Sequence, residues 1–250
     1  MRYFAICFLC VAVPSAAPAV TPERFEYNGV LYHAVRAEPA QVRILLVDGN
    51  GARLRTFPSA RKHLLSLGET PSVLMNGGIF EPEGVPSGLL IQRGVTHRMI
   101  NRRDGDGNFF LKPNGVLVLT GDKAAVIDSR EFGPPHVAAD YAVQSGPLLL
   151  RRGQTHASFR PDSNSRLHRN GVGVTDDGSV LFLMTDIDSP KFPNLFEFAD
   201  VFRHHKCVDA LFLDGDLCQM ATGPAMAEPL PLLSECTLHS QPFIQSEFVE

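Results

Sequence analysis

The sequence predicts an α+β fold: a single domain with a mixed, mostly antiparallel sheet and a few packed helices. Many short apolar segments are separated by Gly, Asn, Asp and Pro, which is the pattern of short strands joined by turns. Only two segments carry a helical pattern, and no repeat or long linker divides the 250 residues. A chain of this length with 44% hydrophobic residues can bury a full core without disulfides.

The first 19 residues are typical of a secretory signal peptide. Arg2 precedes an apolar run over residues 3–13, and Ala17-Pro18-Ala19 supplies small residues for cleavage after Ala19. The run is shorter than the roughly 20 residues that cross a bilayer. A buried first helix is the alternative, but Pro14 ends it and nothing caps it. We therefore expect a mature chain of residues 20–250, periplasmic or secreted, with no integral membrane segment.

The strands are predicted from apolar runs flanked by turn residues such as Asn28-Gly29 and Asp176-Asp177-Gly178. In chain order they cover residues 30–35, 42–47, 72–75, 88–91, 109–112, 115–119, 124–127, 148–150, 171–175, 180–185 and 210–213.

Two helices are predicted among these strands. The first covers residues 59–67 and ends at Gly68. The second begins after Asn194, a capping residue with Glu197 three positions on. Its apolar positions share one face, which is the pattern of core packing: Leu195, Phe198, Ala199 and Phe202. The predicted core covers about residues 30–220, and the Pro-rich, polar residues 223–250 are expected to form a loosely packed tail.

Charge and cysteine content exclude several functions. The net charge is −4, and removing Arg2 with the signal leaves 22 basic against 27 acidic residues, so no basic excess is available for nucleic acid. Cys207, Cys218 and Cys236 remain in the mature chain, which allows at most one internal disulfide of undetermined pairing. No CxxC spacing is present, and the acidic loop at 104–108 lacks the rest of a calcium-binding loop. We expect no resident cofactor or metal site.

Asn76-Gly77-Gly78 follows an apolar strand directly. Adjacent glycines allow backbone N–H groups to approach a ligand closely, although a plain tight turn has the same composition. Gln144-Ser145 also ends an apolar run, but Val143 stands where a serine-hydrolase nucleophile motif requires Gly.

Residues 160–169 combine cations and hydroxyls, including Arg160, Ser163 and Arg166. Guanidinium and hydroxyl groups brought together suit a phosphate or phosphodiester, whereas the alternative is a solvated loop with local ion pairs.

Asp214-Gly215-Asp216 places two carboxylates immediately after a buried strand. Paired carboxylates serve glycosidic bond cleavage, one as proton donor and the other as base or nucleophile. They also suit a divalent cation, and an Asp-Gly turn without function remains a further alternative.

Taken in order, these blocks resemble the phosphodiester glycosidase family, and most closely its bacterial exported subgroup. The resemblance covers about residues 30–220 and rests on five blocks: 76–80, 88–94, 144–147, 169–173 and 213–215. The amino-acid sequences of residues 107–115 and 210–216 are similar to those of that subgroup.

The resemblance implies hydrolysis of a sugar-1-phosphodiester, such as an N-acetylglucosamine-1-phosphodiester, at the glycosidic bond. Asp214 or Asp216 would act as base or nucleophile, and Arg166, with Arg160, would neutralise the phosphodiester. Asn76 would hold sugar hydroxyls or phosphate. The further substrate-binding positions implied are Gly77, Gly78, Gln144, Ser145, Ser163, Gly215 and Cys218.

The sequence departs from the family at two positions. Cys218 stands where the family usually has a hydroxyl residue, and Asp216 where many members have Gly. Two alternatives therefore stay open: a non-catalytic protein that binds anionic glycan, and a divalent-cation-dependent phosphodiesterase that uses Asp214 and Asp216.

Overall fold

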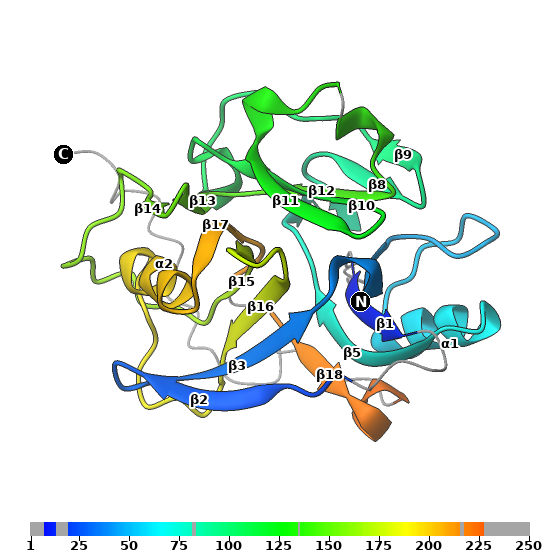
Figure 1. The fold of residues 1–250 in the computed structure, drawn as a ribbon, viewed down its shortest axis with the longest axis horizontal. Coiled ribbons are helices and arrows are strands. Elements are labelled where there is room, and N and C mark those ends of the chain that lie inside the picture. Colours follow the sequence, from blue (N-terminus) through cyan, green and yellow to red (C-terminus); the bar gives the residue numbers. More distant parts are fainter. Residues whose placement is uncertain (1–7, 14–19, 82–83, 135, 216–217, 228–250) are drawn as a thin grey trace.

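The computed structural model describes residues 8–13, 20–81, 84–134, 136–215 and 218–227, and these form a sheet-dominated α+β body (Figure 1). The strands form three main sheets, with orders β18-β5-β1-β4, β11-β10-β12-β8-β9 and β14-β13-β17-β15-β16-β3-β2, and a small β6-β7 pair. Neighbouring strands of the three main sheets pair antiparallel.

The described strands are β1 (Phe8–Val13), β2 (Glu23–Tyr27), β3 (Val30–Ala37), β4 (Val42–Leu45), β5 (Thr70–Asn76), β6 (Phe80–Glu81), β7 (Val85–Pro86), β8 (Leu90–Gln92), β9 (Val95–Arg98), β10 (Gly115–Thr120), β11 (Lys123–Asp128), β12 (Tyr141–Ser145), β13 (Leu148–Arg151), β14 (Gln154–Thr155), β15 (Asn170–Thr175), β16 (Val180–Thr185), β17 (Cys207–Phe212) and β18 (Met220–Thr222). The helices are α1 (Phe57–Ser66) and α2 (Leu195–His204), with 3-10 turns η1 (Pro39–Gln41), η3 (Asn108–Phe110), η4 (Ser129–Glu131), η5 (His136–Ala138) and η6 (Gly223–Ala227).

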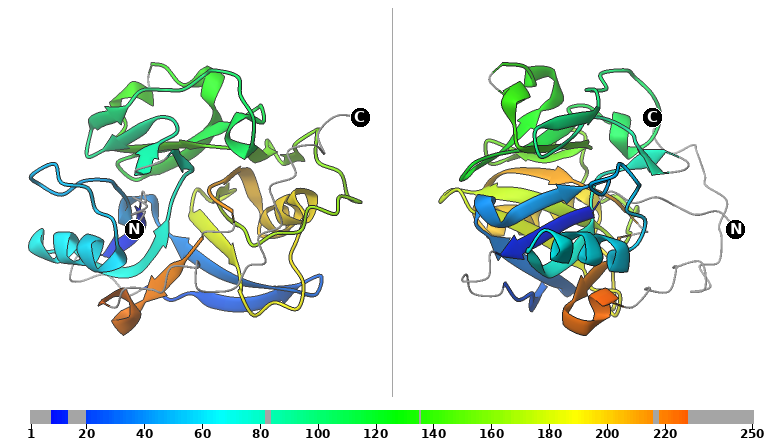
Figure 2. Two further views of the ribbon diagram at one scale, coloured as in Figure 1. Left: turned by 180° about the vertical axis from the view of Figure 1, so that it is seen from behind. Right: turned by 90° about the vertical axis from the view of Figure 1, so that its right-hand side faces the viewer.

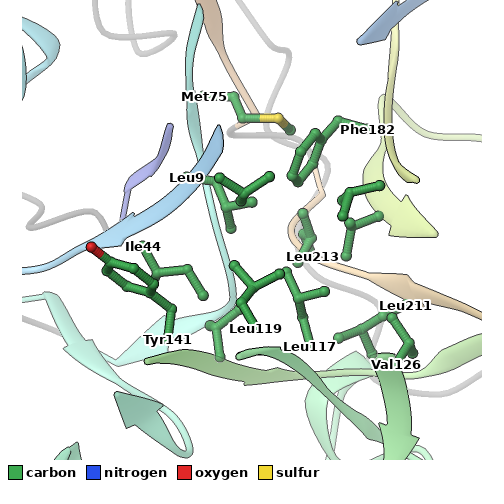
Figure 3. Close-up of a cluster of buried hydrophobic side chains, with 14 of the residues drawn as sticks. Leu9, Ile44, Met75, Leu117, Leu119, Val126, Tyr141, Phe182, Leu211 and Leu213 are labelled. Carbon is green, nitrogen blue, oxygen red and sulfur yellow. The ribbon is translucent and has the colours of Figure 1, made fainter. Parts of the chain in front are cut away.

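The main hydrophobic core lies where the three sheets meet (Figure 3). Leu9, Ile44 and Met75 enter it from the four-stranded sheet, Leu117 from the five-stranded sheet and Phe182 from the seven-stranded sheet. Helix α1 covers the other face of the four-stranded sheet, and α2 covers the seven-stranded sheet (Figure 2). Every sheet therefore buries apolar side chains against another element, as a stable layer arrangement requires.

Both predicted helices are confirmed. The Asn194 side chain accepts a hydrogen bond from the Glu197 N–H, and the Glu197 carboxylate accepts one from the Asn194 N–H, which completes the capping box of α2. Thr56 caps α1 in the same way with Ser59.

Two local predictions are wrong. Residues 109–112 do not form a strand: Gly107, with φ of 88°, opens a turn into η3, and the Phe109 carbonyl accepts a hydrogen bond from the Asn114 side chain. Local hydrogen bonds within residues 107–114 therefore take the place of the strand-to-strand hydrogen bonds that were expected. The tail is not loose from residue 223, because η6 packs Met226 against α1; residues 228–250 lie outside the described part.

Strand β1 comes from the segment predicted as a signal peptide. In the full-length chain it lies between β4 and β5 and pairs with both. Cleavage after Ala19 would remove it, so export and the fold of the mature chain are linked. No helix within the described residues is long and apolar enough to cross a bilayer.

Asp128 gives the fold a testable buried charge. Its side chain is 1% exposed and bonds Arg130 and Arg151 at 2.6 and 2.7 Å. Burial alone would raise the pKa of Asp128, but the hydrogen bonds and charge of Arg130 with the charge of Arg151 outweigh it, so the pKa is lowered.

We expect Asp128→Asn to lower the free energy of unfolding at pH 7 by about 1–2 kcal/mol, because the buried side chain loses charge-assisted hydrogen bonds to Arg130 and Arg151, whose own side chains reach solvent. A folded-state pKa below the unfolded value means that the carboxylate stabilises fully above about pH 4, and that this stabilisation is lost as pH falls through the folded pKa. Urea unfolding at pH 7, 5 and 3 should show the difference from wild type shrinking with acidity. The exposed Asp122→Asn is the matched control; a pH-independent difference would contradict the assignment.

Candidate functional site

The candidate site lies where the four-stranded and seven-stranded sheets meet end to end. Asn76 is the last residue of β5, Asn170 is the first residue of β15, and Asp214 follows the end of β17 by two residues. Strands β15 and β17 are neighbours, so the polar residues at their ends are brought together by strand pairing.

The Asp214 carboxylate is held by two hydrogen bonds. Asn76 Nδ2 donates to Asp214 Oδ2 at 2.9 Å, and the Gly215 N–H donates to Oδ1 at 2.8 Å. Asp214 is only half-buried, whereas Asn76 is 1% exposed. The carboxylate is thus fixed in orientation and remains reachable from solvent.

Asn170 is a site residue that the sequence did not single out. Its amide Nδ2 donates to the Asn76 carbonyl at 3.0 Å, and its Oδ1 accepts from the Asp214 N–H at 2.7 Å. It is fully buried, and so it locks the backbones of both functional residues together. The only sequence signal is its place in the 169–173 block.

The turn after Asp214 is fixed to the same network. The Gln219 N–H donates to Asn76 Oδ1 at 2.6 Å, and the Gly215 carbonyl accepts from the Cys218 N–H at 2.9 Å. Both ends of the Asn76 amide group are therefore used, one on Asp214 and one on the turn. Asp216 lies outside the described residues.

Cys218 is buried and pairs with His168, with Sγ and Nδ1 3.0 Å apart. His168 Nε2 lies 2.5 Å from the Thr185 carbonyl, which can only accept, so Nε2 carries a proton. The Cys218 sulfur and His168 Nδ1 share a hydrogen bond. Cys207 carries a free, buried thiol whose pKa burial raises to about 12, so no disulfide joins it to Cys218. Cys236 lies outside the described residues.

The two glycines after Asn76 are buried, and packing explains Gly78. A Cβ there would approach Val143 Cγ2 to 3.0 Å and the Gln144 carbonyl to 3.1 Å. Gly78 therefore lets the chain pass close to β12. Gly77 keeps its predicted place directly beside Asn76.

Gln144 and Ser145, at the end of β12, bond to backbone groups of the chain segments around the site. Gln144 Oε1 accepts from the Leu89 and Asn101 N–H groups, and its Nε2 donates to the Asn101 carbonyl. Ser145 Oγ donates to the Leu213 carbonyl at 2.7 Å. Both side chains are at most 1% exposed, so their described contacts are with protein backbone.

The 160–166 loop lies on the surface, in front of the N-terminus of α2. Arg166 forms a two-pronged ion pair with Glu197, at 2.5 and 2.9 Å, which raises the pKa of Arg166 and lowers that of Glu197. The Ser163 carbonyl accepts from the Asn194 side chain, and Arg160 is exposed. Arg166 stands two residues before His168, so the chain links this loop to the Asp214 turn. In the described part, no contact joins Arg166 directly to Asp214.

Among the described residues, no group of three or more His, Cys, Asp and Glu side chains is arranged to hold a metal ion. The site's described polar groups are one carboxylate, two carboxamides and backbone amides. Such a set can orient a hydroxylated substrate and move a proton at Asp214.

Comparison with known proteins agrees with this geometry. Residues 69–216 match the model of the phosphodiester glycosidase family. The chain is 31% identical over 189 residues to the uncharacterized protein YigE of Escherichia coli K12, covering 75% of this chain and 72% of that protein. A solved structure, the zebrafish N-acetylglucosamine-1-phosphodiester alpha-N-acetylglucosaminidase catalytic domain auto-inhibited by pro-peptide, shares the fold with a TM-score of 0.56 at 17% identity. That match covers 87% of this chain and 78% of the zebrafish chain.

The chain belongs to the phosphodiester glycosidase family. The matched region contains Asn76, Asn170 and Asp214, so the hydrogen bonds among these three residues lie inside the family domain.

The position of Gln144 leads to a test that separates support from substrate binding. We expect Gln144→Ala to destabilise the protein by about 3 kcal/mol, because two N–H groups and one carbonyl lose their partner. Thermal unfolding measures this cost, with the exposed Gln154→Ala as control. If the folded protein binds a substrate, the affinity for it should change by less than about twofold. A large loss of that affinity without lost stability would show that Gln144 binds substrate.

Proposed function

We propose that the protein is an exported hydrolase that cleaves the glycosidic bond of a sugar-1-phosphodiester, of the N-acetylglucosamine-1-phosphodiester class, in an envelope or extracellular glycan. Family membership supports the reaction class. The observation that carries the proposal is the half-buried Asp214 side chain, whose carboxylate is held by Asn76 and by its own turn.

The reaction replaces one bond at the anomeric carbon. Water supplies the oxygen that becomes the sugar hydroxyl, the bond from the anomeric carbon to the phosphate oxygen breaks, and a phosphomonoester leaves. Because a phosphate oxygen is a good leaving group, little proton donation is needed. The main task is to activate water or to attack the anomeric carbon, which is the role of a carboxylate in glycoside hydrolysis.

Asp214 takes this role in our proposal, and Asp216, two residues on, is the second carboxylate of the pair. Asn76 fixes the orientation of the Asp214 carboxylate by donating a hydrogen bond to its Oδ2. The turn holds the other oxygen, Oδ1, through the Gly215 N–H. Holding a reactive group in one orientation lowers the entropy lost on reaching the transition state.

In our proposal, Arg166 and Arg160, on the surface loop that the chain links to the Asp214 turn, supply the positive charge for the phosphodiester. Guanidinium groups bind phosphate oxygens through paired, charge-assisted hydrogen bonds. Arg166 already presents both terminal nitrogens to a carboxylate, Glu197, and a phosphodiester of the substrate would compete for the same face.

The zebrafish relative is named for N-acetylglucosamine-1-phosphodiester, and we extend that substrate class to this chain. The signal-like residues 1–19 support a reaction in the periplasm or outside the cell.

We expect Asp214→Asn to reduce kcat by about 10²–10⁴-fold, the usual contribution of a carboxylate acting as general base. The amide keeps only one accepting oxygen, so one of the two hydrogen bonds to this side chain is lost and the unfolding temperature should fall by a few degrees, too little to unfold the protein under assay conditions. Release of free sugar and of phosphomonoester from a panel of sugar-1-phosphodiesters is the measurement, and Asp122→Asn is the control.

Two other results would overturn the proposal. Release of sugar-1-phosphate, lost with chelator, would identify a cation-dependent phosphodiesterase. Tight binding of anionic glycan without turnover of any diester, in folded protein, would identify a glycan-binding protein.

Arg166 and Glu197 provide a matched pair of variants. If Arg166 binds the phosphodiester, Arg166→Ala should raise KM about tenfold, the effect of losing one charged hydrogen bond. Glu197→Gln keeps the capping group but removes the competing charge, so KM should stay equal or fall. Equal rises in KM for both variants would show that the ion pair only anchors the loop.

A further inference from the structure

A second cavity lies on the surface between the four-stranded and five-stranded sheets, away from Asp214. Its volume is about 500 Å³, which is within the usual range for sites that bind small molecules. Its lining comes from η1 and β4, from the residue before β5, from the β8–β9 and β10–β11 turns, and from the ends of β10 and β12.

The cavity and the candidate site lie at opposite ends of the same strands. Glu69 lines the cavity and directly precedes β5, whose last residue is Asn76. Tyr141 lines the cavity and begins β12, whose last residue is Ser145. At about 3.3 Å per residue, β5 separates the cavity from Asn76 by roughly 20 Å. The two sites are therefore distinct.

Hydrogen bonds hold the rim of the cavity in place. The Gly94 N–H donates to the Asp140 carbonyl at 2.8 Å, and the Gly121 N–H donates to Asp140 Oδ2 at 2.7 Å. On the other side, Arg43 Nη1 donates to the Ala40 carbonyl at 2.7 Å. Both hairpin turns and η1 are thus fixed by the protein itself, so a ligand would bind without a large ordering cost.

The charges that line the cavity balance. Arg43 Nε donates to Glu69 Oε2 at 2.9 Å, and Arg93 Nη2 donates to Glu69 Oε1 at 2.8 Å. Asp140 adds a second carboxylate at the rim. The described residues that line the cavity therefore carry two positive and two negative charges, and give neither an anion nor a cation a net attraction. They still provide several N–H donors and carboxylate acceptors close together.

Apolar surface and a tyrosine complete the lining. Pro39, Val42 and Leu119 provide apolar surface from η1, β4 and β10. The Tyr141 ring packs beside Ile44, and its hydroxyl points away from the core (Figure 3). Burial raises the pKa of Tyr141, so its hydroxyl stays protonated at neutral pH and can donate a hydrogen bond.

We propose that this cavity is a carbohydrate-binding site that takes a neutral sugar unit. The C–H faces of a sugar ring suit apolar surface, and its hydroxyls both donate and accept hydrogen bonds. Neighbouring hydroxyls match the paired nitrogens of a guanidinium and the paired oxygens of a carboxylate, so the ligand needs no charge. A phosphate or carboxylate would instead have to displace Glu69 from Arg43 and Arg93, and would lie beside Asp140.

Binding at this cavity does not require the proposed hydrolysis. If the bound sugar belongs to the glycan that is cleaved at Asp214, the cavity would keep that glycan on the protein between cleavages. This extension alone rests on the proposed function. Because of the distance between the sites, only a glycan of several sugar units could occupy both at once.

The test measures sugar binding by the full-length chain through backbone NMR. The probes are neutral tetrasaccharides of glucose, mannose and N-acetylglucosamine, each titrated separately. The amide signals of Gly94 and Gly121 report on the cavity, and that of Gly215 reports on the candidate site. Binding at the two places is thereby distinguished in one experiment.

Arg93→Asn is the test variant and Arg152→Asn is its matched control. Both arginines precede Gly in a turn and have φ of 50°, a left-handed conformation that Asn tolerates. Arg93 lines this cavity, whereas Arg152 lines another one. The two variants therefore remove the same group from the same backbone conformation.

We expect at least one neutral tetrasaccharide to shift the Gly94 and Gly121 signals to saturation. Arg93→Asn should raise its Kd at least about tenfold, the effect of losing one hydrogen bond to a charged group. Arg152→Asn should leave the Kd unchanged. The NMR spectrum itself shows that each variant is folded.

Three results would overturn the inference. The first is the absence of any shift at Gly94 and Gly121 with all three sugars, and the second is an equal loss of affinity in both variants. The third is tighter binding of inorganic phosphate or glucuronate than of the neutral sugars at these amides, which would identify an anion site. Sugar release is not the readout, so a failure of the proposed hydrolysis would leave this test standing.

Discussion

The site depends on the hydrogen bonds of one buried carboxamide, Asn170. It joins the Asn76 carbonyl, at the end of one sheet, to the Asp214 N–H, at the end of another. Without this bridge the two strands would end near each other with no fixed spacing. Because a buried amide must satisfy its donor and acceptor at once, the bridge accepts little variation in geometry. The position of the carboxylate is thus set by the packing of whole sheets.

Asn76 likewise uses both ends of its side-chain amide. Its nitrogen donates to Asp214, and its oxygen accepts from the Gln219 N–H. His168 and Cys218 fix the next part of the turn. The Asp214 carboxylate is therefore fixed in orientation by the protein itself, and in the proposed reaction this arrangement would avoid an ordering cost in the transition state. The Cys218 contact with His168 helps to hold the turn that follows Asp214.

Local signals predicted much of this structure. Short sequence patterns predict the cap of α2 and most of the strands. Asn76 and Asp214 are each noticeable because they follow an apolar run. Their contact joins residues 138 positions apart, and the family resemblance, more than local pattern, associated them. Asn170 was missed because one Asn at a strand start gives no sign of its partners. Gln144 and Ser145 were predicted to bind substrate, yet the structure shows them bonded to backbone, a distinction that sequence cannot express. The apolar run that predicts an export signal forms strand β1 in the full-length chain, because apolar runs suit both a signal and a buried strand.

Ser145 adds a third attachment. Its hydroxyl binds the Leu213 carbonyl, so the five-stranded sheet is tied to the chain one residue before Asp214. All three main sheets therefore converge within a few residues of the carboxylate, and none can slide against another without displacing it. Members of the family are consequently expected to differ more in their surface loops than in the three sheets. A substitution that changes the packing of any one sheet should shift the Asp214 carboxylate, even when the substituted residue is far from it.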